Sequence, residues 1–172
     1  MRLLPALIAF LLVVPTVTAQ DARIQEIRDR YYGATDDPEA EGLYQFQVVN
    51  NPDARDYPAV GIYRQEFTLT YTLHENQTPV PVLVVAKDQT AAFQTRTEVL
   101  LDDAGAPMFL YYDYGEGSKR VYYDADGACI RYLMDGESAG CDARGEFQEG
   151  EADMIYYAKA VADLLQVLSI SG

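Results

Sequence analysis

One pentapeptide in the chain has the residue types and spacing of a nucleophilic active site. Gly136-Glu137-Ser138-Ala139-Gly140 fits the pattern G-x-S-x-G, which in α/β-hydrolases holds a serine on a tight strand-to-helix turn beside a histidine base. In that fold the histidine follows the serine, whereas His74, the single histidine here, precedes Ser138. We therefore expect a solvated Gly/Ser loop and no catalytic residue. A small secreted hydrolase that uses Ser138 or paired carboxylates is the alternative.

Carboxylates in the second half of the chain have part of the pattern of a calcium loop. Asp124-Ala125-Asp126-Gly127 matches the start of such a loop, but the twelfth position is Asp135, where a bidentate glutamate is usual. A type I turn explains the same residues. One histidine and two cysteines also predict no zinc site. We expect no metal and no cofactor, although weak calcium binding stays open for carboxylates of neighbouring turns: Asp102, Asp103, Asp113 and Glu116.

Tyrosine is the residue type best suited to a binding surface here, because its ring is apolar and its hydroxyl forms hydrogen bonds. The chain has 14 tyrosines and no tryptophan. Two adjacent pairs lie in predicted strands, where neighbouring side chains point to opposite faces of a sheet. One ring of each pair should therefore lie outside the main core, unless both rings serve core packing. The candidate ligand-binding residues are Tyr111, Tyr112, Tyr122 and Tyr123.

The tyrosine pairs belong to a repetitive stretch, Leu100–Gly136, which predicts an antiparallel β-meander. Two apolar residues followed by an aspartate recur every eleven positions, ending at Asp102, Asp113, Asp124 and Asp135. Asp102-Asp103-Ala104-Gly105 and Asp124-Ala125-Asp126-Gly127 place Asp first and Gly fourth, which favours a type I turn followed by a residue with positive φ. The stretch therefore predicts one β-hairpin used twice.

Helices are predicted at both ends of the chain. A short amphipathic helix at 22–32 should end at Gly33, and a second helix is predicted at 151–168 after a loop at 137–150. The apolar stripe of the second helix is Met154, Tyr157, Ala158, Val161, Leu164, Leu165 and Leu168. Strands are predicted at 44–48, 63–73, 80–86 and 91–101, the third at an edge or starting after Pro81. The fold class is α+β, an antiparallel β-sheet with two Asp-x-x-Gly hairpins, packed on one face by an N-terminal and a C-terminal helix.

The first 19 residues have the features of a secretory signal peptide. Arg2 is followed by an apolar run from Leu3 to Val14, and small residues precede a cleavage site after Ala19. The run is too short to span a membrane, so we expect no membrane span after cleavage. Residues 20–172 then form a single secreted or periplasmic domain of 153 residues (172 − 19). In that oxidising setting Cys129 and Cys141 should form a disulfide.

Three features together resemble a group of uncharacterised exported bacterial proteins with a helix–antiparallel sheet–helix layout. They are the helix that begins Ile24-Gln25-Glu26-Ile27-Arg28, the strand at 61–73 and the two Asp-x-x-Gly hairpins. The similarity covers most of the chain after the signal peptide. The resemblance implies export and no known activity, so no functional residue is carried over from it.

The charge of the chain excludes some partners. It has 27 acidic and 13 basic residues, and loss of Arg2 with the signal peptide leaves a net charge of 12 − 27 = −15. Such a field repels nucleic acid and anionic lipid. Outward tyrosine rings rimmed by acids would suit an unidentified protein, peptide or saccharide better than an anion. We expect an exported, acidic, non-catalytic binding or interaction domain of the cell envelope or extracellular space, and a structural envelope protein is a further alternative.

The same charge indicates either an adaptation to high salt or an ordinary acidic secreted protein, and the first interpretation predicts that salt stabilises the protein. Carboxylates repel one another at low ionic strength, and sodium chloride screens this repulsion. We expect the melting temperature, followed by circular dichroism, to rise from low to molar sodium chloride. A flat or falling curve would refute the interpretation of the acidic surface as an adaptation to high salt.

Overall fold

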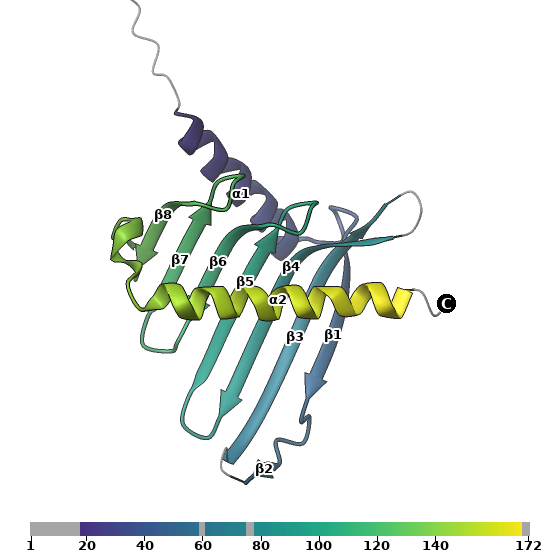
Figure 1. Cartoon of the computed structure of the whole chain (residues 1–172). Helices are drawn as coiled ribbons and strands as arrows, with labels where there is room; N and C mark the ends of the chain where they lie inside the picture. Colours follow the sequence, from purple (N-terminus) through teal and green to yellow (C-terminus); the bar gives the residue numbers. More distant parts are fainter. Residues whose placement is uncertain (1–17, 59–60, 75–77, 170–172) are drawn as a thin grey trace, which may run out of the picture.

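The computed structural model describes residues 18–58, 61–74 and 78–169, with side chains up to Leu164. Residues 1–17 of the predicted signal peptide lie outside the described part. The described chain forms one antiparallel sheet and two long helices (Figure 1). The predicted α+β fold class, with a helix at each end and a β-meander between, is confirmed.

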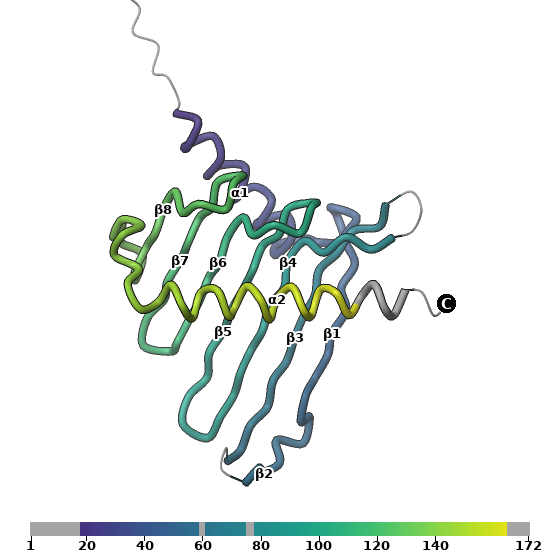
Figure 2. The backbone as a smooth tube through the Cα atoms, in the orientation of Figure 1, coloured from purple at the N-terminus to yellow at the C-terminus, as the bar shows by residue number. Residues whose placement is uncertain are grey.

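The sheet has nine strands, and most of them pair with the next strand along the chain. The helices are α1 (Ala19–Asp36) and α2 (Phe147–Ser169), with a short 3-10 helix, η1 (Cys141–Arg144), before α2. The strands are β1 (Tyr44–Asn50), β2 (Asp56–Tyr57), β3 (Gly61–Leu73), β4 (Pro79–Thr90), β5 (Gln94–Leu101), β6 (Pro107–Asp113), β7 (Ser118–Tyr123), β8 (Cys129–Met134) and β9 (Glu137–Ser138). Their spatial order is β1-β3-β4-β5-β6-β7-β8-β9, with β2 beside β3, so that β3 to β9 form successive hairpins (Figure 2).

The two Asp-x-x-Gly turns have the predicted chemistry. The Oδ1 atom of Asp102 accepts hydrogen bonds from the amides of Ala104 and Ala106, at 2.9 and 2.7 Å. Gly105 has a φ of 77°, and its amide donates to the Asp102 carbonyl. Asp124 repeats this arrangement after β7. The aspartate carboxylate therefore accepts hydrogen bonds from turn amides for which the sheet supplies no acceptor, and the glycine provides the positive φ.

The aspartates at the other end of the sheet also close turns. Asp113 accepts from the amide of Gly115 at 2.8 Å, and Asp135 accepts from the amide of Ser118 at 2.7 Å. Because consecutive strands are antiparallel, Asp102 and Asp113 lie at opposite ends of the meander. The carboxylates left open for weak calcium binding are therefore not brought together. Among the described residues no group of three or more metal-binding side chains is found.

The two helices cover opposite faces of the sheet, so the prediction that both pack on one face is wrong. Ile27 of α1 and Ala158 of α2 are buried in separate clusters. Consecutive residues of β5 divide between these clusters, Val99 on the side of α2 and Leu100 on the side of α1. Because strand side chains alternate, this division places the helices on the two faces. We refer to the α1 face and the α2 face.

Three β-bulges at one end of the sheet supply part of the contact with α1. In the pairs β3–β4, β5–β6 and β7–β8, the second strand carries one residue more than the first. The extra residues are Val82, Met108 and Ile130, which all pack in the apolar cluster beneath α1. Regular alternation would have turned them to the α2 face. The bulges therefore add three apolar side chains where α1 docks.

Pro81 lies inside β4, beside one of these bulges, so the strand does not start after the proline. β4 lies between β3 and β5, so the prediction that it is an edge strand is also wrong. The described pairing of β4 with β5 stops at Leu83, which pairs with Leu100. The first residues of β4 therefore have only β3 as a partner strand within the described sheet. A proline is tolerated there because one side of the strand needs no donor.

Both helices are longer than predicted, and the predicted loop at 137–150 is structured. α1 continues through Gly33, whose missing side chain leaves room for Glu41, since a Cβ there would lie 3.3 Å from the Glu41 Cγ. The interval before α2 contains β9 and η1. Of the predicted stripe of α2, Met154, Ala158 and Val161 pack in the core, whereas Tyr157 and Leu164 are 64% and 49% exposed. The side chains of Leu165 and Leu168 lie outside the described residues.

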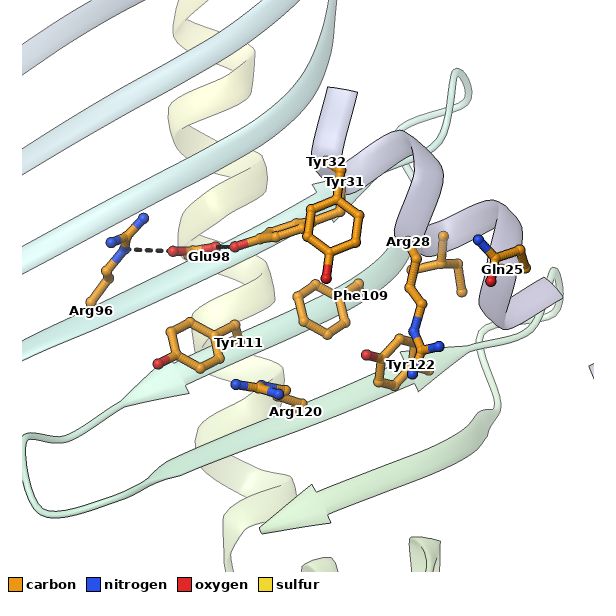
Figure 3. A pocket seen from close by; sticks show the side chains of 11 residues that line it. Gln25, Arg28, Tyr31, Tyr32, Arg96, Glu98, Phe109, Tyr111, Arg120 and Tyr122 are labelled. Atoms are coloured by element: carbon orange, nitrogen blue, oxygen red, sulfur yellow. Dashed lines mark hydrogen bonds and ion pairs between the residues drawn. The ribbon is translucent and has the colours of Figure 1, made fainter. Parts of the chain in front are cut away.

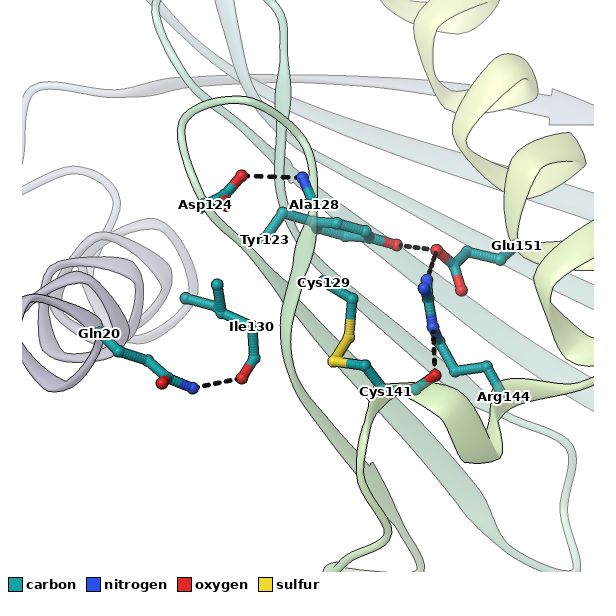
Figure 4. The surroundings of a disulfide bond; sticks show 9 residues. All are labelled: Gln20, Tyr123, Asp124, Ala128, Cys129, Ile130, Cys141, Arg144 and Glu151. Carbon is teal, nitrogen blue, oxygen red and sulfur yellow. Dashed lines mark hydrogen bonds and ion pairs between the residues drawn. A yellow bond between two sulfur atoms is a disulfide. The ribbon is translucent and has the colours of Figure 1, made fainter.

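The predicted disulfide between Cys129 and Cys141 is confirmed, with the two Cα atoms 5.9 Å apart. It ties β8 to η1, twelve residues later in the chain (Figure 4). η1 ends at Arg144, whose Nη1 atom lies 2.7 Å from the Oε1 atom of Glu151 on α2. The disulfide therefore holds the segment that leads into α2.

Removing this disulfide should lower the stability of the protein. A disulfide that closes a loop of this length lowers the conformational entropy of the unfolded chain, which stabilises the folded state by about 3 kcal/mol. We expect the double substitution Cys129→Ser and Cys141→Ser to lower the free energy of unfolding by ~2–3 kcal/mol in urea titrations. Ser138→Ala, on the exposed strand beside β8, is the control and should change stability by less than ~0.5 kcal/mol. An unchanged free energy in the double variant would contradict a stabilising role.

Candidate functional site

α1 covers only part of its face of the sheet, and the residue type changes where its cover ends. Beneath the helix lies a buried apolar row from three adjacent strands: Leu100, Phe109 and Tyr122. Two positions further along the same strands lies a row with polar groups: Glu98, Tyr111 and Arg120. Seen from the α2 side, α1 lies behind one end of the sheet and leaves the other end uncovered (Figure 1).

A groove of about 560 Å³ runs along this boundary between α1 and the sheet. Three of its lining residues are arginines and four are tyrosines, and we name it the arginine–tyrosine groove (Figure 3). Its lining residues come from α1, β5, β6 and β7: Gln25, Ile27, Arg28, Tyr31, Tyr32, Arg96, Glu98, Phe109, Tyr111, Arg120 and Tyr122.

Glu98 is the one acidic residue of the lining, and it is 1% exposed. Its Oε1 atom lies 2.5 Å from the Nε atom of Arg96, and its Oε2 atom accepts a hydrogen bond from the Tyr31 hydroxyl. Burial, followed by the hydrogen bond to Glu98, raises the pKa of Tyr31 above its usual value. Tyr31 therefore stays a protonated donor, and it joins α1 to a buried carboxylate of the sheet.

The other two arginines of the groove have no acidic partner. Neither Arg28 nor Arg120 forms an ion pair or hydrogen bond with a described residue. Arg120 lies over the ring of Tyr111, with its Cζ atom 5.4 Å from the ring centroid. Arg28 extends from α1 toward Tyr122 (Figure 3). Two guanidinium groups from opposite walls therefore remain available to a ligand.

The structure divides the four predicted tyrosines between the two faces of the sheet. Tyr111 and Tyr122 line the groove on the α1 face, while Tyr112 and Tyr123 pack with the α2 cluster. The expectation that one ring of each pair lies outside the core is wrong for the second pair, since Tyr122 and Tyr123 are 6% and 3% exposed. Both rings are buried because Tyr122 packs in the cluster of α1 and Tyr123 in the cluster of α2, so both faces of the sheet are covered there. The first pair is half-buried on both faces.

A second polar cluster lies beneath α2 and centres on one oxygen of Glu151, while the other oxygen, Oε2, is buried without a hydrogen-bond partner among the described residues (Figure 4). The buried Oε1 atom of Glu151 accepts a hydrogen bond from the Tyr123 hydroxyl at 2.8 Å and from Arg144 at 2.7 Å. Arg144 also donates from Nε to the Cys141 carbonyl at 3.1 Å. This cluster attaches the start of α2 to the sheet, so we assign it a structural role.

The residues of the serine motif are not assembled into a catalytic site. Ser138 is exposed on β9, and the backbone of Ser138 pairs with Leu133 of β8. His74 follows β3, and strands β4 to β8 lie between β3 and β9. No strand-to-helix turn holds the serine, because η1 follows it only after Ala139 and Gly140.

Comparison with known proteins gives no further assignment. A scan of protein-family models and searches of curated proteins and of solved structures found no match to this chain. No described helix is both long and apolar enough to cross a membrane.

Sequence reasoning found Tyr111 and Tyr122 but missed the charged residues of the groove. Part of the site could have been predicted, because Arg120 and Tyr122 are two positions apart in β7 and their side chains must therefore share a face of the sheet. Arg28 and Tyr31 are likewise one helical turn apart. Nothing in the sequence pairs these helix residues with that face of the sheet.

Replacing Tyr31 with phenylalanine should destabilise the protein, because it leaves the buried Oε2 atom of Glu98 without its donor. We expect Tyr31→Phe to lower the free energy of unfolding by ~1–3 kcal/mol in urea titrations. Tyr32→Phe is the control, because Tyr32 is exposed on the same helix. Equal effects of the two substitutions would show that the contact with Glu98 contributes nothing.

Proposed function

We propose that the protein is an exported, non-catalytic binding domain that holds a small ligand in the arginine–tyrosine groove. The single observation that carries this proposal is that two guanidinium groups without an acidic partner among the described residues line one groove of an otherwise acidic protein. The groove volume of about 560 Å³ also falls within the usual range for small-molecule sites, ~300–1,000 Å³. The disulfide and the predicted signal peptide support a location in the periplasm or outside the cell.

The lining residues favour binding over catalysis. Both carboxylate oxygens of Glu98 are occupied, one by Arg96 and one by Tyr31. Burial, and then the neighbouring Asp113, raise the pKa of Tyr111 above its usual value, as burial does for Tyr31. These phenols stay protonated near neutral pH, and arginine does not lose its proton in proteins. The groove can therefore donate hydrogen bonds, but these groups supply no general base.

Blocking the groove should abolish ligand binding. Gln25 is exposed on α1 and lines the groove, so the substitution Gln25→Trp places a large ring at its mouth. Gln148→Trp makes the same change at an exposed position of α2, on the other face. In a thermal-shift screen of small molecules, ligands should raise the melting temperature of the wild type and of Gln148→Trp but not of Gln25→Trp. A ligand at ~100 times its Kd stabilises by about 2.7 kcal/mol, which such a screen resolves.

Ligands that stabilise Gln25→Trp as much as the wild type would place binding elsewhere. A structural envelope protein, the competing explanation, predicts no ligand of the groove at all. A small hydrolase predicts turnover of aryl esters that Ser138→Ala abolishes.

A further inference from the structure

We infer that the ligand of the groove is a small organic anion, whose carboxylate or phosphate is held between Arg28 and Arg120 and whose apolar part lies against the aromatic wall. This inference rests on the proposed function, because it specifies the chemistry of the same site. It differs from the sequence-based expectation of a platform rimmed by acids, since the groove is lined by three arginines and a single acid.

The groove differs from the rest of the surface in that two of its arginines form no ion pair with a described carboxylate. Acids outnumber bases by 27 to 13 in the chain, and six of the nine described arginines form an ion pair with a carboxylate. The described arginines without such a pair are Arg28, Arg120 and Arg131. Arg131 lies on β8 directly opposite Tyr122, on the same face. All three therefore gather at one corner of the α1 face.

The local charge of the groove is opposite to that of the protein. Arg28, Arg96 and Arg120 contribute three positive charges, and Glu98 contributes one negative charge, which leaves 3 − 1 = +2 in the lining. The whole chain carries −14. A concave site with low-dielectric walls concentrates its field, so an anion repelled by most of the surface is attracted here. Large polyanions remain excluded because they would also meet the acidic surroundings.

The geometry of the two arginines suits the acid group of a ligand. A guanidinium presents paired N–H donors that match a carboxylate or phosphate. The Tyr111 ring beneath Arg120 restricts where this guanidinium lies, through a cation–π contact. Arg28 comes from α1, on the opposite wall of the groove (Figure 3). The acid group would therefore bridge the helix and the sheet.

The aromatic wall indicates that the ligand is more than an inorganic ion. The ring centroids of Phe109 and Tyr122 lie 4.9 Å apart, and those of Phe109 and Tyr31 lie 5.3 Å apart. These three rings are neighbours, and all of them line the groove that also holds the arginines. The groove volume also exceeds what a free phosphate or sulfate would fill. A ring-bearing acid uses both the charge and the apolar wall.

Calorimetric titration of the full chain tests the inference with four probes: phenyl phosphate, benzoate, inorganic phosphate and the neutral benzyl alcohol. We expect phenyl phosphate and benzoate to bind, and inorganic phosphate and benzyl alcohol to bind at least about tenfold more weakly, because each lacks one half of the recognition. Binding of the aromatic anions should also weaken as sodium chloride rises.

Substitutions identify the groups that hold the anion. Arg120→Gln and Arg28→Gln should each weaken binding of phenyl phosphate by about 10- to 100-fold, as expected for loss of a charged hydrogen bond. Arg55→Gln removes the same charge from an exposed residue outside the groove and should change affinity by less than about twofold. Circular dichroism confirms the fold of each variant, and Arg28→Gln, at a half-buried helix position, serves if Arg120→Gln does not fold.

Failure of this inference can be told apart from failure of the proposed function. If benzyl alcohol binds as tightly as phenyl phosphate and Gln25→Trp abolishes both, the groove binds ligands but does not select anions. If the anions bind Gln25→Trp as well as the wild type, both proposals are wrong. If no probe binds at millimolar concentration, the anion inference is overturned, while the ligand screen still tests the groove.

Discussion

The difference in cover between the two faces of the sheet is the constraint on which the rest of the structure depends. Where both helices lie over a strand, consecutive residues must be apolar, as at Val99, Leu100 and Leu101. Where α1 no longer covers its face, alternate positions return to polar residues. Glu98 lies at this boundary, too buried to be hydrated and therefore dependent on Tyr31 and Arg96. The groove is the space that this unequal cover leaves open.

Each helix is joined to the sheet by the same set of groups. On the α1 face a glutamate of the sheet accepts from a tyrosine of the helix, and on the α2 face a tyrosine of the sheet donates to Glu151 of the helix. In both clusters an arginine also forms an ion pair with the glutamate. Hydrogen-bonded charges of this kind add little net stability, but breaking one leaves a buried charge without a partner. The clusters therefore favour one position of each helix over a sliding apolar contact.

The sequence predicted what local chemistry determines, and failed where distant segments meet. The hairpin turns, the strand alternation, the helix at each end and the disulfide all follow from residues close in the chain, apart from the small errors at helix ends. The placement of the helices on opposite faces was missed, although the three consecutive apolar residues at Val99–Leu101 signal burial on both sides. Of the candidate site, two tyrosines were found. The arginines were missed because Arg28 and Arg120 come to line the same groove only when α1 packs on the sheet.

Each of the three bulges changes the α1 face of the sheet by a single residue. Val82, Met108 and Ile130 are each the one residue by which a strand exceeds its partner, and all three face α1. In an evolutionary sense, part of the docking surface of a helix has the form of three single-residue insertions into an otherwise regular meander. Such insertions can be gained or lost one at a time without altering the strand order. Among proteins that share this strand order, the α1 face, which carries the groove, can thus differ in sequence while the α2 face stays the same.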